Sequence, residues 1–256
     1  MTICYFTATG NCLYIAESLG GTCLSIPKLM RQAQIEIADD AVGIVCPVYA
    51  GEMPKMVRAF LAKANIKTDY FFFIYTYGMA YGEAFAHAAL AARAAGLALA
   101  YVGAVRMVDN YLPIFKMQQQ IEHLPEKKVE QHLFAIRRDI ESRKTTAVRI
   151  TPAVKLKMAV YQAAAKRILN GDTAQSYLVN ASCTLCGVCA RVCPADNIRL
   201  TDKVNFSSRC EVCYACLHNC PQNAIHLKRE ASPARFRNAN VSLKQIVAAN
   251  DDTDKA

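Results

Sequence analysis

Eight of the chain's 12 cysteines fall into two identical runs near its C-terminal end. The runs are Cys183, Cys186, Cys189 and Cys193, followed by Pro194, and Cys210, Cys213, Cys216 and Cys220, followed by Pro221. Each cysteine of the first run recurs 27 residues later (183 to 210, 193 to 220), and so do the proline, Ile198 and Leu200. This repeat predicts two short units packed about a pseudo-twofold axis, which bury between them whatever the cysteines bind.

The spacing within each run, C-x2-C-x2-C-x3-C-P, is typical of cysteines that hold [4Fe–4S] clusters. Three thiolates wrap a tight loop around one cube, and the proline turns the chain away after the fourth. A zinc site is one alternative, but zinc sites usually use two separated cysteine pairs. A disulfide framework is the other, but it needs an oxidising compartment. The N-terminal Thr2–Phe6 segment reads as a strand and not as a signal peptide.

The paired runs resemble the two-cluster domain of bacterial ferredoxins. In that family the fourth cysteine of each run ligates the cluster of the other run. The resemblance therefore implies two [4Fe–4S] clusters, cluster I on Cys183, Cys186, Cys189 and Cys220, and cluster II on Cys210, Cys213, Cys216 and Cys193. It also implies that the chain moves electrons.

Size and composition leave room for a second, larger domain. The chain has 256 residues, of which 53% are hydrophobic, enough for a sizeable core. Its most apolar stretch, Ala84 to Val105, is rich in alanine and contains His87 and Arg93, so it is a poor membrane span. A cytoplasmic protein is expected. The other cysteines, Cys4, Cys12, Cys23 and Cys46, lie in or beside apolar runs, and all but Cys12 are expected to be buried thiols.

The net charge of +9 is concentrated between the two domains. Residues 123–170 contain 11 Lys and Arg against 4 Asp and Glu, whereas residues 177–230 contain 6 against 4. One interpretation is a solvated helical face. The other is a docking surface for an acidic redox partner protein, because such fields steer encounter. Nucleic acid is disfavoured, since the basic block has no interleaved aromatic residues.

Strands and helices alternate over the first 115 residues. Strands are expected at Thr2–Phe6, Cys23–Ile26, Val42–Cys46, Tyr70–Tyr75 and Leu97–Val105, and helices at Asn11–Leu19, Lys55–Ala64 and Gly82–Ala95. This order predicts an α/β fold with a doubly wound, five-stranded parallel sheet. Sheets of this class bind ligands beyond the carboxyl ends of their strands.

The loop after the first strand has the features of a phosphate cradle. Thr7-Ala8-Thr9-Gly10-Asn11-Cys12 leads directly into a helix, whose N-terminus offers N–H groups and a positive dipole end. Gly10 would let the backbone approach a ligand closely. The loop lacks the lysine of a nucleotide P-loop and the G-x-G-x-x-G of dinucleotide folds. An ordinary helix cap is the alternative interpretation.

Three loops together resemble the flavodoxin–ferredoxin fusion family over residues 1–115 and 177–230. The loop at 7–12 is similar to the T-x-T-G-N-T loop of flavodoxins, with Cys12 in place of Thr. The loops at 47–54 (P-V-Y-A-G-E-M-P) and 76–82 are similar to those that flank the flavin. The resemblance implies FMN held by Thr7, Thr9, Gly10, Asn11, Cys12, Pro47, Val48, Tyr49, Ala50, Gly51, Thr76, Tyr77, Gly78, Tyr81 and Gly82.

Aromatic and polar residues complete the expected flavin site. Tyr49 and either Tyr81 or Tyr77 are the rings expected to lie against the flavin. The segment Asp109–Tyr111 starts at the same sheet edge, where it would close over the ring, hold a small substrate or form a plain turn. No histidine shows paired ligand spacing, and no catalytic residue is predicted.

The expected architecture has four parts. Residues 1–115 form a flavodoxin-like domain, 116–175 a helical connector, 176–232 a small α+β ferredoxin domain with two clusters, and 233–256 a polar, mobile tail. The connector is expected to hold a long helix over 117–145, broken at Pro125, and a second from Pro152 to Leu169, ended by Asn170-Gly171.

These features favour a cytoplasmic electron-transfer flavoprotein that passes electrons between FMN, two clusters and a redox partner. One alternative is an FMN-dependent reductase of a small molecule, fed by the clusters. A redox sensor is the other. An open, polar-lined pocket near Asp109–Tyr111 would favour the reductase. Oxygen damages exposed clusters, so an anaerobic or microaerobic host is implied.

Overall fold

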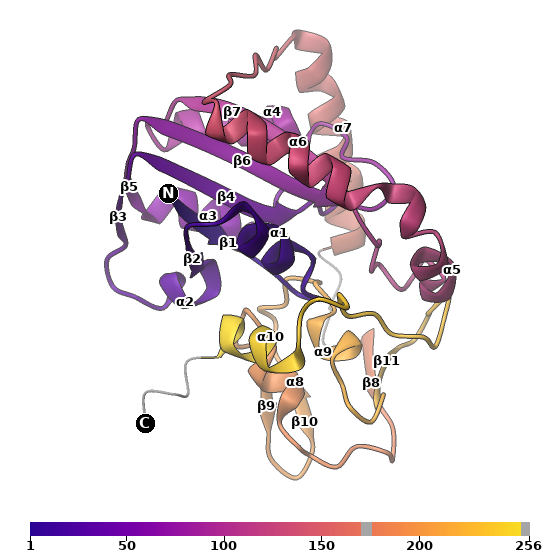
Figure 1. Cartoon of the computed structure of the whole chain (residues 1–256). Helices are drawn as coiled ribbons and strands as arrows, with labels where there is room; N and C mark the ends of the chain where they lie inside the picture. The colour runs from indigo at the N-terminus through magenta and orange to yellow at the C-terminus, as the bar shows by residue number, and fades with distance from the viewer. Residues whose placement is uncertain (170–175, 252–256) are drawn as a thin grey trace.

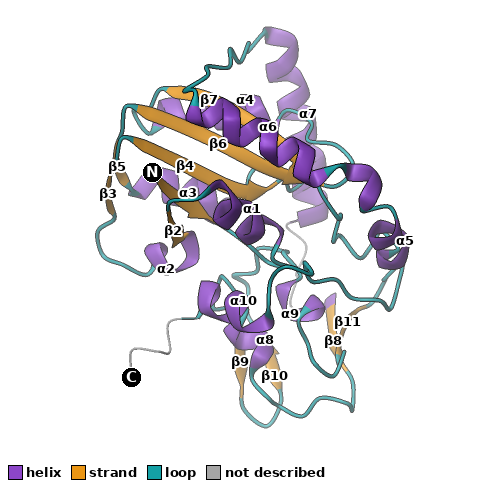
Figure 2. Cartoon of the chain, in the orientation of Figure 1, coloured by secondary structure: helices purple, strands orange, loops and turns teal. Residues whose placement is uncertain are grey.

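A five-stranded parallel sheet forms the centre of the larger part of the chain (Figures 1 and 2). The computed structural model describes residues 1–169 and 176–251. The strands are β1 (Thr2–Tyr5), β2 (Thr22–Ser25), β4 (Ala41–Pro47), β6 (Tyr70–Tyr77) and β7 (Leu99–Arg106), in the order β2-β1-β4-β6-β7. When only these five strands are numbered in chain order, their order across the sheet is 2-1-3-4-5, which is the flavodoxin-like order. The predicted fold class is confirmed.

The central strands are apolar along their whole length because helices cover both faces of the sheet. In β6, seven consecutive residues of the segment YFFFIYTY are buried. The helices α1 (Asn11–Leu19) and α6 (Val129–Glu141) cover one face, and α3 (Lys55–Lys63) and α4 (Ala84–Ala94) cover the other (Figure 1). The expected strands and helices of this unit agree with the structure to within two residues at most ends.

Short elements that were not predicted complete this unit. The helix α2 (Ile26–Met30) follows β2, and β3 (Glu36–Ala38) pairs in parallel with β5 (Asn65–Lys67) outside the main sheet. These segments have three to five residues each, too few for a hydrophobic periodicity to be recognised.

The connector differs from its prediction in the first half. Residues 117–145 do not form one long helix but three pieces: α5 (Met117–Glu122), a 3-10 turn η1 (Pro125–Lys127) and α6. Pro125 begins the turn, and Lys128 has a positive φ of 47° that separates it from α6. The second connector helix, α7 (Pro152–Leu169), is confirmed. Its expected stop at Asn170-Gly171 lies outside the described residues.

The smaller unit consists of two antiparallel strand pairs and two single-turn helices. Strand β8 (Tyr177–Val179) pairs with β11 (Ile225–Leu227), and β9 (Ile198–Leu200) pairs with β10 (Val204–Phe206). The helices are α8 (Val188–Arg191) and α9 (Ala215–His218), which contact each other. The repeated residues Ile198 and Ile225 occupy matching positions in β9 and β11, so the sequence repeat is also a repeat of structure.

The C-terminal segment is packed up to residue 251 and contains a helix, so its prediction as a mobile tail was wrong for residues 233–251. Helix α10 (Leu243–Asn250) buries Ile246, Val247 and Ala249. It lies between α2 of the larger unit and α8 of the smaller one (Figure 1). The Arg31 guanidinium donates to the Asn250 carbonyl at 2.8 Å. Helix α10 therefore joins the two units.

A capping box stabilises the start of α10. The Ser242 hydroxyl accepts from the Gln245 N–H at 3.2 Å, while Gln245 Oε1 accepts from the Ser242 N–H at 2.9 Å. Ser242→Ala is expected to lower the free energy of unfolding by about 1 kcal/mol, as for other lost caps. Anaerobic thermal unfolding measures this. Ser242→Asp retains a capping oxygen and is expected to keep most of the stability; equal losses in both variants would contradict the capping role.

Within residues 1–169 and 176–251, no helix has the length and apolarity needed to cross a membrane.

Candidate functional site

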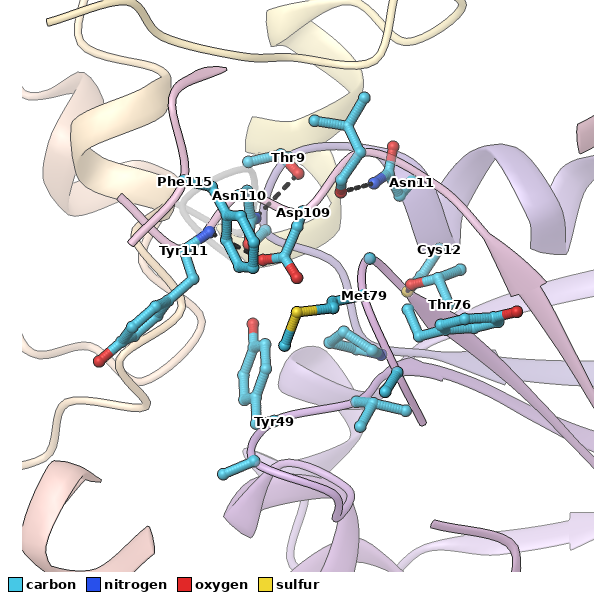
Figure 3. A pocket seen from close by; sticks show the side chains of 18 of the residues that line it. Thr9, Asn11, Cys12, Tyr49, Thr76, Met79, Asp109, Asn110, Tyr111 and Phe115 are labelled. Atoms are coloured by element: carbon cyan, nitrogen blue, oxygen red, sulfur yellow. Dashed lines mark hydrogen bonds between the residues drawn. The ribbon is translucent and has the colours of Figure 1, made fainter. Parts of the chain in front are cut away.

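A cavity of about 350 Å³ lies at the carboxyl ends of the sheet strands, where the two units meet (Figure 3). Of the 15 residues expected to bind FMN, 13 line this cavity: Thr7, Thr9, Asn11, Cys12, Pro47, Val48, Tyr49, Ala50, Gly51, Thr76, Tyr77, Gly78 and Gly82. Gly10 and Tyr81 do not line it. The three loops that sequence analysis singled out are thus brought together.

The first loop turns sharply into α1 at Gly10. Gly10 has φ 95°, and its N–H donates to the Thr7 hydroxyl at 3.2 Å. A Cβ atom at this position would lie 2.9 Å from Cβ of Val241, which precedes α10. Glycine is therefore required for the approach of the C-terminal segment. Close approach of the Gly10 backbone to a ligand stays a prediction.

Cys12 is buried at the first turn of α1. Its Sγ shares a hydrogen bond of 3.1 Å with the Thr76 hydroxyl. Burial raises the pKa of the Cys12 thiol to about 12. The side chain is therefore neutral at physiological pH, and it presents no negative charge to an anionic group held at the loop.

The second loop makes a tight turn that aims Tyr49 into the cavity. Ala50 and Gly51 both have positive φ, 48° and 80°, as a type I′ turn requires. Tyr49 and Glu52 exchange backbone hydrogen bonds of 2.8 and 3.1 Å across it. The buried Tyr49 hydroxyl has no hydrogen-bond partner among the residues that the structure describes, and Figure 3 shows it pointing into the cavity. An orphaned donor here fits a bound polar ligand.

The third loop is held against Asp109. A Cβ atom on Gly78 would lie 2.1 Å from Cβ of Asp109, so the two backbones meet here without room for a side chain. Tyr77 faces the cavity. Tyr81 instead stacks on Phe85 at 4.8 Å between ring centroids, which turns it away from the cavity. Of the predicted rings, Tyr49 and Tyr77 are the ones that line the cavity.

Asp109 is a partly buried carboxyl at the cavity wall. Its Oδ1 accepts from the Tyr111 N–H at 3.1 Å. Burial raises the pKa of this carboxyl, and Lys127 partly opposes that shift. The buried Lys127 ammonium donates to the Met107 carbonyl at 2.6 Å and to Gln120 Oε1 at 2.9 Å. Burial also lowers the pKa of Lys127.

Asp109→Asn is expected to raise the free energy of unfolding at neutral pH and not in acid. Because the folded-state pKa is raised, the carboxyl costs no stability below its ordinary pKa of about 3.9, and its cost grows as pH rises through the folded-state pKa. Asparagine keeps an oxygen for the Tyr111 N–H but carries no charge. Anaerobic urea unfolding between about pH 3 and pH 7 measures the difference. An increase in unfolding free energy that is the same at every pH would contradict the raised pKa assigned to Asp109.

Each set of four cysteines expected to share a cluster lines one small cavity in the smaller unit. The outer quartet comprises Cys183, Cys186, Cys189 and Cys220. The inner quartet comprises Cys193, Cys210, Cys213 and Cys216. The fourth cysteine of each run thus lies with the other run's triplet. Among the described residues, no three His, Cys, Asp or Glu side chains converge on a single metal ion.

Backbone N–H groups and one hydroxyl point at these sulfur atoms. The Asn197 and Ala224 N–H groups donate to Cys193 and Cys220 Sγ at 3.4 and 3.3 Å, at equivalent positions of the repeat. The Tyr177 hydroxyl lies 3.2 Å from Cys210 Sγ. Hydrogen bonds to sulfur stabilise negative charge and tune the potential of a cluster. This donor set fits a [4Fe–4S] cube.

The inner quartet adjoins the larger cavity. Val212 lines that cavity, next in sequence to Cys213. The Tyr111 and Tyr214 rings meet across the same junction, with centroids 5.6 Å apart. Cys186 of the outer quartet is exposed. The three sites therefore form a row from the cavity through the inner quartet to the surface.

Several lining residues were not among the predicted ligands. Asp109, Asn110 and Tyr111 were expected near the site and line it, whereas Ala8, Met79, Ala80, Val108, Ile114, Phe115 and Val212 were not singled out. Ala8, Met79 and Ala80 belong to the predicted loops and could have been included. Val212 comes from a cysteine run, and no local pattern shows which domain surface it faces.

Comparison with known proteins identifies part of the smaller unit. Residues 177–199 match the family model of the 4Fe-4S binding domain. The chain contains an iron–sulfur cluster-binding domain. No curated protein gives a significant match.

Solved structures with likeness to the chain include flavoproteins. They include a provisionally named flavoprotein from Bacteroides uniformis (13% identity, TM-score 0.33, 48% of this chain and 97% of that one). A flavodoxin from the domain Archaea has 13% identity and a TM-score of 0.29, over 55% of this chain and 97% of that one. The flavodiiron core of Flv1 from Synechocystis has 18% identity and a TM-score of 0.30, over 53% and 36%. These TM-scores are too low to identify the fold, which is identified from the strand order instead.

Proposed function

We propose that this chain is an intracellular electron-transfer iron–sulfur flavoprotein. It would hold FMN in the large cavity and a [4Fe–4S] cluster in each cysteine quartet, and exchange electrons with an external redox protein. The observation that carries this proposal is the shared wall between the cavity and the inner quartet, formed by Val212 and by the Tyr111–Tyr214 contact.

The cofactors supply the redox chemistry, because a flavin exchanges one or two electrons and each cluster exchanges one. The chain supplies binding and orientation. The loop at 7–12 would hold the FMN phosphate at the N-terminus of α1. Tyr49 and Tyr77 would lie against the flavin, and the apolar wall of the cavity would exclude water from it.

The outer quartet is the proposed exchange point with the partner. Cys186 is exposed there, and the neighbouring Leu185 is 41% exposed. An apolar contact surface beside an exposed cluster ligand brings a partner's redox centre close. The basic connector would steer an acidic partner toward the chain, because fields of this kind act before contact.

A small-molecule reductase is the second candidate, and the cavity supports it less. Two polar side chains near the ring site, Asp109 and Asn110, are already engaged within the protein. Asp109 accepts from the Tyr111 N–H, and Asn110 Nδ2 donates to the Thr9 hydroxyl at 3.1 Å. A substrate would have to break these bonds to be recognised. No observation favours a redox sensor.

Cofactor content tests the proposal. After strictly anaerobic purification, iron, acid-labile sulfide and flavin are measured per chain, and the flavin is identified by chromatography. About eight irons, eight sulfides and one FMN are expected, since each cube contains four irons. About four irons would overturn the two-cluster assignment. Eight irons without flavin, even after incubation with excess FMN, would overturn the flavin assignment. We also propose an anaerobic or microaerobic cytoplasm as its setting, because oxygen damages exposed clusters.

A further inference from the structure

The segment between Cys216 of the inner quartet and Cys220 of the outer quartet departs from the repeat. The first run has Ala190-Arg191-Val192 at this place, and the second has Leu217-His218-Asn219. His218 and Asn219 are buried, with 5% and 2% of their surfaces exposed. Both point out of the smaller unit and hydrogen-bond to loops of the large cavity.

Asn219 fixes the backbone of the phosphate loop. Its Nδ2 donates to the Ala8 carbonyl at 3.1 Å and to the Ala215 carbonyl at 2.9 Å. The carbonyls of the residues before and after Ala8 also accept hydrogen bonds, in both cases from the C-terminal segment. The Thr7 carbonyl accepts from Asn250 Nδ2 at 3.4 Å, and the Thr9 carbonyl accepts from the Asn238 N–H at 2.8 Å.

These bonds set the direction of the loop's N–H groups. In a trans peptide the C=O of one residue and the N–H of the next point in opposite directions. The Thr7 and Ala8 carbonyls face Asn250 and Asn219, so the N–H groups of Ala8 and Thr9 face the opposite way. Both residues line the cavity. The orientation of the phosphate cradle is thus imposed jointly by Asn219 of the cluster-binding unit and by the C-terminal segment.

His218 fixes a second part of the same site. The Phe236 N–H donates to His218 Nδ1 at 3.1 Å, so the proton of the neutral ring lies on Nε2, which donates to the Asn110 carbonyl at 2.9 Å. Asn110 in turn donates to the Thr9 hydroxyl. His218 therefore acts on the phosphate loop through Asn110.

We propose that the 217–219 segment makes FMN binding depend on cluster assembly. Helix α9 has only four residues, too short to be stable alone. It is held in place by the cluster ligands on either side of it. With both clusters bound, Asn219 and His218 reach the flavin-site loops; without them, the cradle loses its orientation. This inference rests on the proposed function. Asn219 is a positioning residue, and linkage requires that bound FMN protects the clusters in return.

Flavin titration of the cluster-loaded, full-length chain tests the proposal. Asn219→Ala is expected to bind FMN roughly tenfold more weakly than wild type, the scale of one buried hydrogen bond. Riboflavin lacks the phosphate and is expected to bind both proteins equally. Asn205→Ala is the matched control, because its Nδ2 bonds only within the β9–β10 hairpin; it is expected to bind FMN like wild type. Iron content is measured in every sample.

Removal of the clusters by anaerobic chelation is expected to weaken FMN binding at least as much as Asn219→Ala. Equal FMN affinity in wild type, Asn219→Ala and the cluster-free chain would overturn the inference and leave the proposed function intact. No FMN binding to the cluster-loaded wild type would overturn the proposed function itself. If Asn219→Ala does not load its iron, a second measurement tests the coupling: the rate at which wild type loses iron to a chelator, with and without bound FMN. Slower loss with FMN supports the coupling, and equal rates overturn it.

Discussion

Cys213→Ala is expected to lower the iron content from about eight to about four per chain, because each cube holds four irons. It is also expected to stop electron exchange between the flavin and a partner protein. Cys213 is buried in the inner quartet, next in sequence to Val212 at the cavity wall. Without the inner cluster, no redox centre lies between the flavin and the cluster of the outer quartet. Anaerobic iron analysis and partner reduction measure both effects.

Two matched variants separate the roles of the cysteines. Cys23→Ala removes a thiol from β2, remote in sequence from both runs, and is expected to keep about eight irons. Cys186→Ala is expected to remove the outer cluster, so that partner reduction fails while the inner cluster remains. Full iron content in Cys213→Ala, or full partner reduction without the inner cluster, would contradict the proposed row of centres.

Gly10→Ala is expected to lower the free energy of unfolding by about 3 kcal/mol. A left-handed conformation costs a non-glycine residue roughly 1–2 kcal/mol, and overpacking costs a further amount of about 1–3 kcal/mol. Both apply here, because Gly10 has φ 95° and its new Cβ would lie 2.9 Å from Cβ of Val241. FMN affinity is expected to fall as well, since the phosphate loop must shift. Anaerobic urea unfolding and flavin titration measure these losses.

Gly96→Ala provides the control for backbone strain. Gly96 has φ 74°, and a Cβ there would meet nothing within 4 Å. It should therefore show the strain of a positive φ without the clash, a loss of about 1–2 kcal/mol. Val241→Ala is expected to recover part of the loss in Gly10→Ala. Equal losses at Gly10 and Gly96 would mean that the contact between the loop and the C-terminal segment contributes no packing constraint.

The sequence predicted those features that local patterns define. The strands of the main sheet were found because each is a buried apolar run bounded by Gly, Pro or polar residues. Helix α1 was found at both ends, since Gly10 precedes it and Gly20 follows it. The cysteine runs were found because their spacing is typical of cluster ligands, and the resemblance to ferredoxins implied how the runs share their fourth cysteines. Each of these signals lies within about 40 residues of chain.

Features that depend on contacts between distant segments were missed. Helix α10 has only Leu243, Ile246 and Val247 as strong apolar residues within a polar segment, and its burial depends on α2 and α8. The role of Gly10 depends on Val241, more than 200 residues away in sequence. Tyr81 was misplaced because its stacking on Phe85 competes with an orientation toward the cavity. Tertiary packing determines such burial and side-chain orientations, and the hydrophobic periodicity of the sequence does not predict them.

The central claim is that flavin electrons leave the protein through the cysteine quartets. The most direct test mixes the fully reduced, cofactor-loaded protein with a one-electron acceptor protein under anaerobic conditions, and follows flavin and cluster absorbance together. The account predicts that flavin and clusters both reoxidise in wild type, and that the flavin stays reduced in Cys213→Ala. Reoxidation of the clusters while the wild-type flavin stays reduced would contradict it, as would unchanged flavin reoxidation in Cys213→Ala.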